Sequence, residues 1–245
     1  MGHSNRPEIK AILFDWDMTL GAALGSVSTG ERTSTLFRRL GINYDSEAIV
    51  TAMAQRRQAI EQGATPDPQA PQTKELLLRY YQQLLQLLDG AEASLQLCEQ
   101  IYDEYAHLPF VFYSDTLPAF QALAARAIRL GIITNHSPQI RPVIEEKLQE
   151  FVRPEHIIIS GELDLYKPDP PIFIEAAARL EIPVEQCLYV GDNLEVDAIG
   201  AVTAGGYACG LWCDRSDQPA PEKFPPAVYR ITELGQVLNW VDSRR

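Results

Sequence analysis

The stretch Ile12-Leu13-Phe14-Asp15-Trp16-Asp17-Met18-Thr19 joins a short apolar run to two acids. Residues 9–14 read as a buried β-strand, so Asp15 and Asp17 are expected at the rim of a hydrophobic sheet. Neighbouring carboxylates repel each other and lose hydration on burial, and each then needs a cation or a hydrogen-bond donor. Folding alone does not require such a pair. The stretch therefore predicts a functional site, for which a divalent metal and a lysine are the natural partners.

Composition limits the class of protein. The chain has 245 residues, 46% of them hydrophobic, which is enough for one large core or two smaller ones. A net charge of −12 argues against nucleic acid or an anionic membrane as the main partner, although a small anionic substrate is compatible with a locally positive site. The four cysteines form no Cys-X-X-Cys pair, and no secretory or membrane-length apolar run is visible. We therefore expect a cytoplasmic protein.

A helical insertion follows the first strand. Apolar residues at helical spacing predict four helices within residues 21–109, and three of these helices are expected to end at Gly41, Gly63 and Gly90. A proline-rich segment, residues 65–71, separates the second helix from the third. The pattern predicts a four-helix unit of roughly ninety residues.

From about residue 110, short apolar strands alternate with helices. Helices are expected at 116–130, 138–151, 171–180 and 196–204, strands at 131–133, 156–159, 187–190 and 207–212, and a last strand–helix pair within 228–241. This alternation predicts an α/β fold with a doubly wound, mostly parallel, Rossmann-like sheet. The predicted core comprises residues 1–20 and 110–245, with residues 21–109 as the inserted domain.

Polar residues follow one predicted strand after another. They are Asp15 and Asp17, Thr134 and Asn135, Ser160, and Asp192. In an open parallel sheet the carboxyl ends of the strands lie along one edge, where ligands bind. Residues far apart in the sequence are therefore predicted to form one site.

The first two acids suit phosphoryl transfer. Asp15 is a candidate nucleophile, and Asp17 could protonate the leaving oxygen and later deprotonate a water molecule. Read alone, the pair could equally be turn or helix-capping residues.

The other strand ends offer phosphate and metal ligands. Thr134 precedes a helix opened by a proline, which indicates either an anion site or a simple N-cap. Lys167 lies in a proline-stiffened loop that would hold an ammonium group ready for a phosphoryl oxygen. Asp192 and Asp197 carry the carboxylate oxygens that Mg²⁺ prefers, although acids at a helix start also complement its dipole.

Together these segments resemble the motifs of the haloacid dehalogenase superfamily of phosphohydrolases, and the resemblance covers nearly the whole chain. The four motifs occur in order as Asp15-Trp16-Asp17-Met18-Thr19-Leu20, Ile133-Thr134-Asn135, Lys167-Pro168, and Gly191-Asp192 with Asp197. Met18 departs from the pattern, since glycine is commoner there.

The resemblance implies a role for each motif residue. It implies Asp15 as nucleophile, Asp17 as general acid and base, and Thr134, Asn135 and Lys167 as phosphate ligands. It also implies Mg²⁺ held by Asp15, the main-chain carbonyl of Asp17, and Asp192, with Asp197 binding or supporting it. The four inserted helices are similar to the type I cap of the family, hinged near residues 21–30 and 108–113.

The predicted function is a Mg²⁺-dependent phosphatase that acts on a small phosphorylated metabolite through an aspartyl phosphate. A phosphomutase of the same superfamily and a non-catalytic protein that binds a phosphorylated ligand or a partner stay open as alternatives. Dehalogenases of the superfamily need no second acid, so Asp17 counts against that activity. His136 could face the site and Arg56-Arg57 could bind a substrate carboxylate or second phosphate, but structural or solvated roles are the commoner ones for such residues. The sequence does not indicate an oligomeric state.

Overall fold

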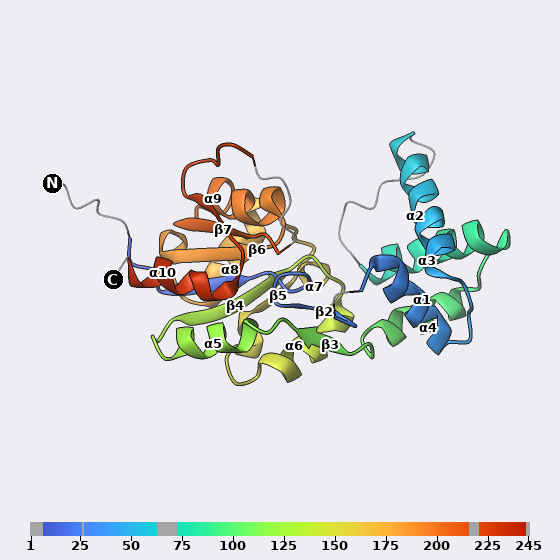
Figure 1. The fold of residues 1–245 in the computed structure, drawn as a ribbon, viewed down its shortest axis with the longest axis horizontal. Helices are drawn as coiled ribbons and strands as arrows, with labels where there is room; N and C mark the ends of the chain where they lie inside the picture. The colour runs from blue at the N-terminus through green and yellow to red at the C-terminus, as the bar shows by residue number, and fades with distance from the viewer. Residues whose placement is uncertain (1–6, 26, 63–72, 216–220, 244–245) are drawn as a thin grey trace.

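The computed structural model describes residues 7–25, 27–62, 73–215 and 221–243. Figure 1 shows two parts, a sheet flanked by helices and a separate group of four helices to one side. The strands are β1 (Ala11–Phe14), β2 (Gly21–Ala23), β3 (Phe110–Phe112), β4 (Arg129–Thr134), β5 (Ile157–Ile159), β6 (Cys187–Gly191), β7 (Cys209–Cys213) and β8 (Val228–Ile231). The helices are α1 (Thr29–Arg39), α2 (Ser46–Glu61), α3 (Lys74–Asp89), α4 (Leu95–Tyr105), α5 (Thr116–Ala124), α6 (Arg141–Leu148), α7 (Ser160–Leu163), α8 (Pro170–Arg179), α9 (Gly200–Thr203) and α10 (Val237–Asp242), with a π-helical segment, η4 (Leu194–Ile199), directly before α9.

The main sheet has six parallel strands in the order β5-β4-β1-β6-β7-β8. The chain builds one half of the sheet from β1 outward to β5 and then crosses back to β6 on the other side of β1. Phe14, the last residue of β1, is level with Ile132 of β4 and Val190 of β6. Asp15 therefore leaves the sheet at the point where the strand order reverses, where open α/β sheets bind ligands.

The sheet is buried on both faces because its strands are apolar at almost every position. Ile12 and Phe14 pack with α5 and α6 on one face, whereas Ala11 and Leu13 pack with α8 on the other. This is the pattern expected of a doubly wound parallel sheet. The predicted fold class is confirmed.

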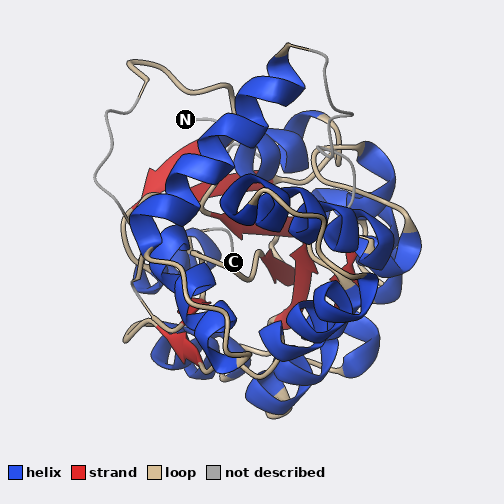
Figure 2. Cartoon of the chain, turned by 90° about the vertical axis from the view of Figure 1, so that its right-hand side faces the viewer, coloured by secondary structure: helices blue, strands red, loops and turns tan. Residues whose placement is uncertain are grey.

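The four helices α1–α4 lie between β2 and β3, which pair antiparallel at the base of the unit. Each helix begins with a side chain that accepts a main-chain N–H of its first turn, as strong N-cap residues do. These residues are Ser28, Asp45, Thr73 and Ser94. The helices also share a hydrophobic core of their own, which includes Phe37, Leu84 and Ile101. Figure 2, which views this side of the molecule, shows the helices in front of the strands. We call α1–α4 the cap; its domain boundaries at residues 21 and 109 stay a prediction.

The structure corrects several expected element boundaries. The helix expected at 116–130 ends at Ala124, because Ala127 takes a left-handed conformation (φ 58°) and the chain then enters β4 at Arg129. Gly30, expected in a flexible connection, lies inside α1, where a β-carbon would approach Val50 and Ser46 to within 3 Å. Gly63 and residues 65–71 lie outside the described residues.

Among the residues described, no helix is both long and apolar enough to cross a bilayer.

Candidate active site

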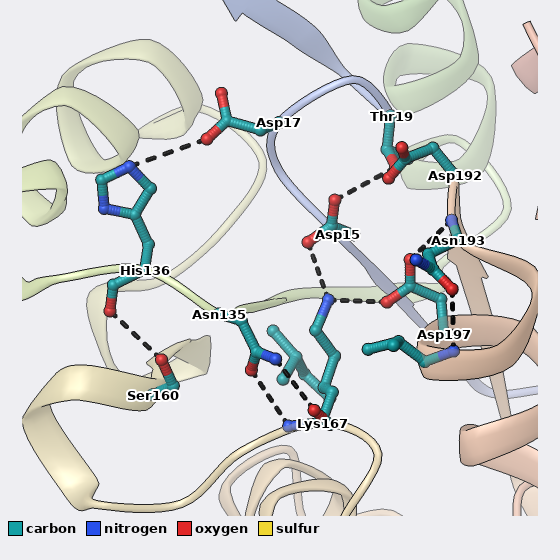
Figure 3. A network of polar contacts seen from close by, with 12 residues as sticks. Asp15, Asp17, Thr19, Asn135, His136, Ser160, Lys167, Asp192, Asn193 and Asp197 are labelled. Atoms are coloured by element: carbon teal, nitrogen blue, oxygen red, sulfur yellow. Dashed lines mark hydrogen bonds and ion pairs between the residues drawn. The ribbon is translucent and has the colours of Figure 1, made fainter. Parts of the chain in front are cut away.

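Asp15 is held rigidly at the end of β1. Its main-chain N–H donates to the carbonyl of Val190 at 2.9 Å, which extends the β1–β6 ladder by one residue. Its carboxylate is buried and accepts from Lys167 Nζ at 2.7 Å and from Thr19 Oγ1 at 3.2 Å (Figure 3). Thr19 Oγ1 also lies 3.4 Å from Asp192 Oδ1. Both oxygens of the predicted nucleophile are thus oriented by neighbouring side chains.

Lys167 is buried among polar partners. Its ammonium group donates to Asp15 and Asp197, each at 2.7 Å, and to the Tyr189 hydroxyl at 2.9 Å. Burial lowers the pKa of Lys167, but the facing carboxylates of Asp15 and Asp197 outweigh it and raise the pKa overall. The lysine therefore stays charged and offsets part of the negative charge at the site.

Asn135 fixes the loop that carries this lysine. Its side-chain amide donates to the Lys167 carbonyl at 2.9 Å and accepts from the Lys167 N–H at 3.0 Å. Asn135 was predicted as a phosphate ligand, and the structure adds a second use for its side chain. Thr134 is the buried last residue of β4, the strand beside β1. The phosphate-binding roles of both residues stay predictions.

Asp197 is brought to the site by the π-helical segment η4. Its Oδ2 accepts from the Asn193 N–H at 3.0 Å, which leaves Oδ1 facing Lys167. Close approach is possible because residue 191 is glycine: a β-carbon there would lie 2.3 Å from the Asp197 carboxyl carbon. The sequence motif Gly191-Asp192 is therefore a packing requirement for Asp197 as well as a strand end.

Three carboxylates meet around this lysine. Asp15, Asp192 and Asp197 each offer an oxygen, and these atoms lie within 4.8 Å of one another. Burial, with the charges of Asp15 and Asp197 added, raises the pKa of Asp192 to about 8. Burial likewise raises the pKa of Asp197 to about 6, although the Lys167 ammonium acts against it. The positive charge of one ammonium group does not neutralise three carboxylates. A donor set made only of oxygen atoms fits a hard cation such as Mg²⁺.

The Asp17 side chain points away from Asp15 and the other clustered acids. Its carboxylate is about a third exposed and lies 3.6 Å from His136 Nε2, away from the acidic cluster (Figure 3). The turn between the two acids places Met18 at φ 61°, a left-handed conformation in which glycine is favoured, and the Met18 side chain is exposed. The structure thus separates one acid facing the lysine from a second acid facing the cap.

Sequence reasoning missed or underweighted three residues of this network. Thr19 bridges Asp15 and Asp192, Tyr189 links Lys167 to the Ile133 carbonyl, and His136 contacts Asp17. The sequence offered a signal for two of these residues, because Thr19 lies within the first motif and His136 lies beside the second. Tyr189 lies inside an apolar strand, where only the fold shows which face its hydroxyl reaches.

Comparison with known proteins extends these observations. Residues 9–205 match the family of haloacid dehalogenase-like hydrolases. The chain belongs to this family. Among its relatives is the glyceraldehyde 3-phosphate phosphatase of Methanopyrus kandleri, 30% identical over 202 residues that cover 80% of this chain and 81% of the relative. The N-acylneuraminate-9-phosphatase of Mus musculus is 24% identical over 245 residues, which cover 96% of each chain.

Solved structures agree on the fold. The 2-haloacid dehalogenase of Pseudomonas syringae pv. Tomato superposes with a TM-score of 0.67 at 22% identity, over 96% of this chain and 99% of that one. Sequence and structure thus confirm the predicted superfamily. The phosphatases among the relatives support the predicted enzyme class, a phosphoric monoester hydrolase.

Proposed function

We propose that the enzyme is a Mg²⁺-dependent phosphatase that hydrolyses a small phosphorylated metabolite through an aspartyl phosphate on Asp15. The observation that carries the proposal is the separation of the two motif acids. Asp15 is buried against Lys167, whereas Asp17 is partly exposed and lies on the side of the cap. A nucleophile needs an ionised, oriented oxygen, and a general acid needs access to the leaving group.

In the first step an Asp15 oxygen attacks phosphorus, and the bond from phosphorus to the leaving-group oxygen breaks while Asp17 gives that oxygen a proton. In the second step Asp17 takes a proton from water, the water oxygen attacks phosphorus, and the bond to Asp15 breaks. Free Asp15 and inorganic phosphate result. Lys167, Thr134 and Asn135 would bind the phosphoryl oxygens during both steps.

Asp15, Asp192 and Asp197, with the main-chain carbonyl of Asp17, are the groups that would hold Mg²⁺. When bound, the ion would neutralise the clustered acids and the negative charge of the transferring phosphoryl group. The raised pKa values of Asp192 and Asp197 support this assignment, because they reflect buried negative charge that a single lysine leaves uncompensated.

The relatives that are phosphatases support phosphoryl rather than halide chemistry, and so does Asp17, since a carbon–halogen bond needs no acid for its leaving group. A phosphomutase stays an alternative that the same experiment tests. It would move phosphate between positions of a substrate without releasing it.

The test is inorganic phosphate release from a panel of phosphorylated metabolites and an aryl phosphate, with Mg²⁺ and with chelator. We expect Mg²⁺-dependent release that falls at least about 10⁴-fold in Asp15→Asn. Asp17→Asn should still form the phosphoenzyme slowly from an activated aryl ester. Asp103→Asn, a change at an exposed acid of α4, is the matched control. Full activity in Asp15→Asn would exclude this mechanism.

A further inference from the structure

A cavity of about 380 Å³ lies between the cap helices and the segment that follows β4. All four cap helices line it, and the loop after β4 closes it with His136 and Gln139. His136 is also the residue that contacts Asp17, at 3.6 Å. The cavity therefore begins beside the residue that contacts Asp17, on the side where the proposed mechanism places the leaving group. This inference rests on the proposed function.

The charge of the cavity is opposite to that of the chain. The protein carries 33 acidic residues and a net charge of −12, yet the lining contributed by the described residues includes Arg32 and Arg56 and no acid. Arg56 is engaged within the cap, because its Nε donates to Gln83 Oε1 at 2.8 Å and its guanidinium lies over the Tyr80 ring. Arg32 differs.

Two residues that line the cavity each have a buried polar side-chain atom with no hydrogen-bond partner within the described part of the chain. These atoms are Arg32 Nε and Gln139 Oε1. A buried donor or acceptor without a partner is destabilising, and a charged donor more so. Arg32 Nε thus has no acceptor, and Gln139 Oε1 no donor, among the residues described, and a ligand bound in the cavity would supply both.

The remaining wall suits a carbon skeleton. Leu36, Met53 and Leu76 supply aliphatic surface, and Tyr80, Tyr81 and Tyr105 supply aromatic surface. Small-molecule sites of this volume commonly combine such a wall with a few polar groups that set orientation.

We infer that this cavity selects phosphate monoesters whose leaving group carries a carboxylate, bound by Arg32, and a hydroxyl or amide donor for Gln139. An arginine matches a carboxylate with two parallel N–H donors, which provides both binding energy and direction. The substrate class is therefore the phosphorylated hydroxy acids and sugar acids, as opposed to neutral polyol or sugar phosphates.

The experiment compares kcat/KM of the full-length enzyme with Mg²⁺ on two matched pairs of esters. The pairs are 3-phosphoglycerate with glycerol 3-phosphate, and 6-phosphogluconate with sorbitol 6-phosphate, and within each pair only a carboxylate replaces a hydroxymethyl group. We expect the acid to be preferred at least about tenfold in one pair, and Arg32→Gln to lower its kcat/KM about 10- to 100-fold. The neutral ester should change less than about threefold.

Three further variants separate recognition from folding and from overall charge. Arg57→Gln removes the same charge from an exposed cap position and should leave the preference unchanged. Arg32→Lys should restore part of the preference. Gln139→Glu should reduce activity on the acid more than on its neutral partner, because it places a negative charge opposite the carboxylate.

Equal kcat/KM within both pairs, or an equal loss on both esters in Arg32→Gln, would overturn the inference while leaving phosphatase activity intact. An Arg32-dependent preference for fructose 1,6-bisphosphate over both acids would overturn it in favour of a second phosphate. Absence of hydrolysis for all esters would instead overturn the proposed function. In that case a rise in melting temperature with gluconate but not sorbitol, lost in Arg32→Gln, would still support the carboxylate site.

Discussion

The site at the sheet edge and the cavity under the cap differ in how their polar groups are satisfied. At the sheet edge, Lys167 has three partners and Asp15 has two, all within the protein. In the cavity, Arg32 Nε and Gln139 Oε1 have none among the residues described. The hydrogen bonds that orient Asp15 and Lys167 are formed within the protein before substrate arrives, whereas under the proposal above the unpartnered atoms of the second region find their partners on the substrate.

This difference matches what each region has to do. The phosphoryl group is the same in every phosphate monoester, so the groups that handle it can be oriented in advance, which lowers the reorganisation needed during reaction. The leaving group differs between substrates, and unsatisfied polar atoms discriminate strongly against molecules that lack the matching group. The two regions meet at His136, which lines the cavity and contacts Asp17.

The largest effect should follow from removing the charge at the centre of the sheet-edge site. Lys167→Met leaves the two buried carboxylates of Asp15 and Asp197 without their ammonium partner, and we expect a loss of about 3–5 kcal/mol of stability in metal-free protein at neutral pH. Activity should fall at least about 10³-fold. Denaturant unfolding and phosphate release measure the two effects. Lys147→Met, at an exposed position on α6, is the control, and comparable losses there would refute the assignment.

A smaller effect should follow from removing side-chain volume from the hydrophobic core of the cap. Leu84 is fully buried there, and Leu84→Ala should cost about 3 kcal/mol of unfolding free energy. Because the sheet-edge acids are untouched, the rise in melting temperature with Mg²⁺ should persist. Leu87→Ala, on the exposed face of the same helix, should be nearly neutral. Loss of the Mg²⁺ effect in Leu84→Ala would show that the two regions are not independent.

The acidic cluster should also make stability depend on pH. Folding raises the pKa of Asp192 from 3.8 to about 8 and that of Asp197 from 3.8 to about 6. The native state therefore binds more protons than the unfolded state across this range, and the stability of metal-free protein should fall as the pH rises from about 4 to about 8.

Mg²⁺ should counteract that loss, because its binding requires deprotonated carboxylates. We expect millimolar Mg²⁺ to raise the melting temperature by about 5 °C or more at pH 8 and by less at pH 5.5. Asp192→Asn should weaken the pH dependence, and Asp103→Asn should not. Equal Mg²⁺ shifts at both pH values would argue against metal binding by these acids.

The smallest effect should come from the turn between the two motif acids. Met18 has a positive φ and an exposed side chain, so Met18→Gly relieves backbone strain but adds flexibility to the unfolded chain. We expect a change in stability of less than about 1 kcal/mol and unaltered kcat/KM. A large fall in kcat/KM would show that the Met18 side chain contacts substrate.

The structure brings together the sheet-edge residues that the sequence singled out, whereas no sequence pattern indicated the cavity. Asp15, Asp192 and Lys167 are recognisable because each follows a strand or lies in a stiff loop, and a parallel sheet brings such positions to one edge. Arg32 carries no such signal. It lies near the start of an amphipathic cap helix, α1. Arg56-Arg57, the pair that the sequence draws attention to, contains one residue bound within the cap and one exposed to solvent.

By itself the sequence determined the fold class, the four inserted helices and the acids at the strand ends, because these depend on local periodicity, N-caps and abrupt changes from apolar to charged residues. Only the tertiary structure decided that Asp17 turns toward His136, that Tyr189 supports Lys167, and that Arg32 and Gln139 have unpartnered atoms in one cavity. The physical reason is that a helix or strand pattern specifies which face is buried but not which neighbour that face meets. Pairing of buried polar groups is settled by contacts between segments more than a hundred residues apart, such as Asp15 and Lys167.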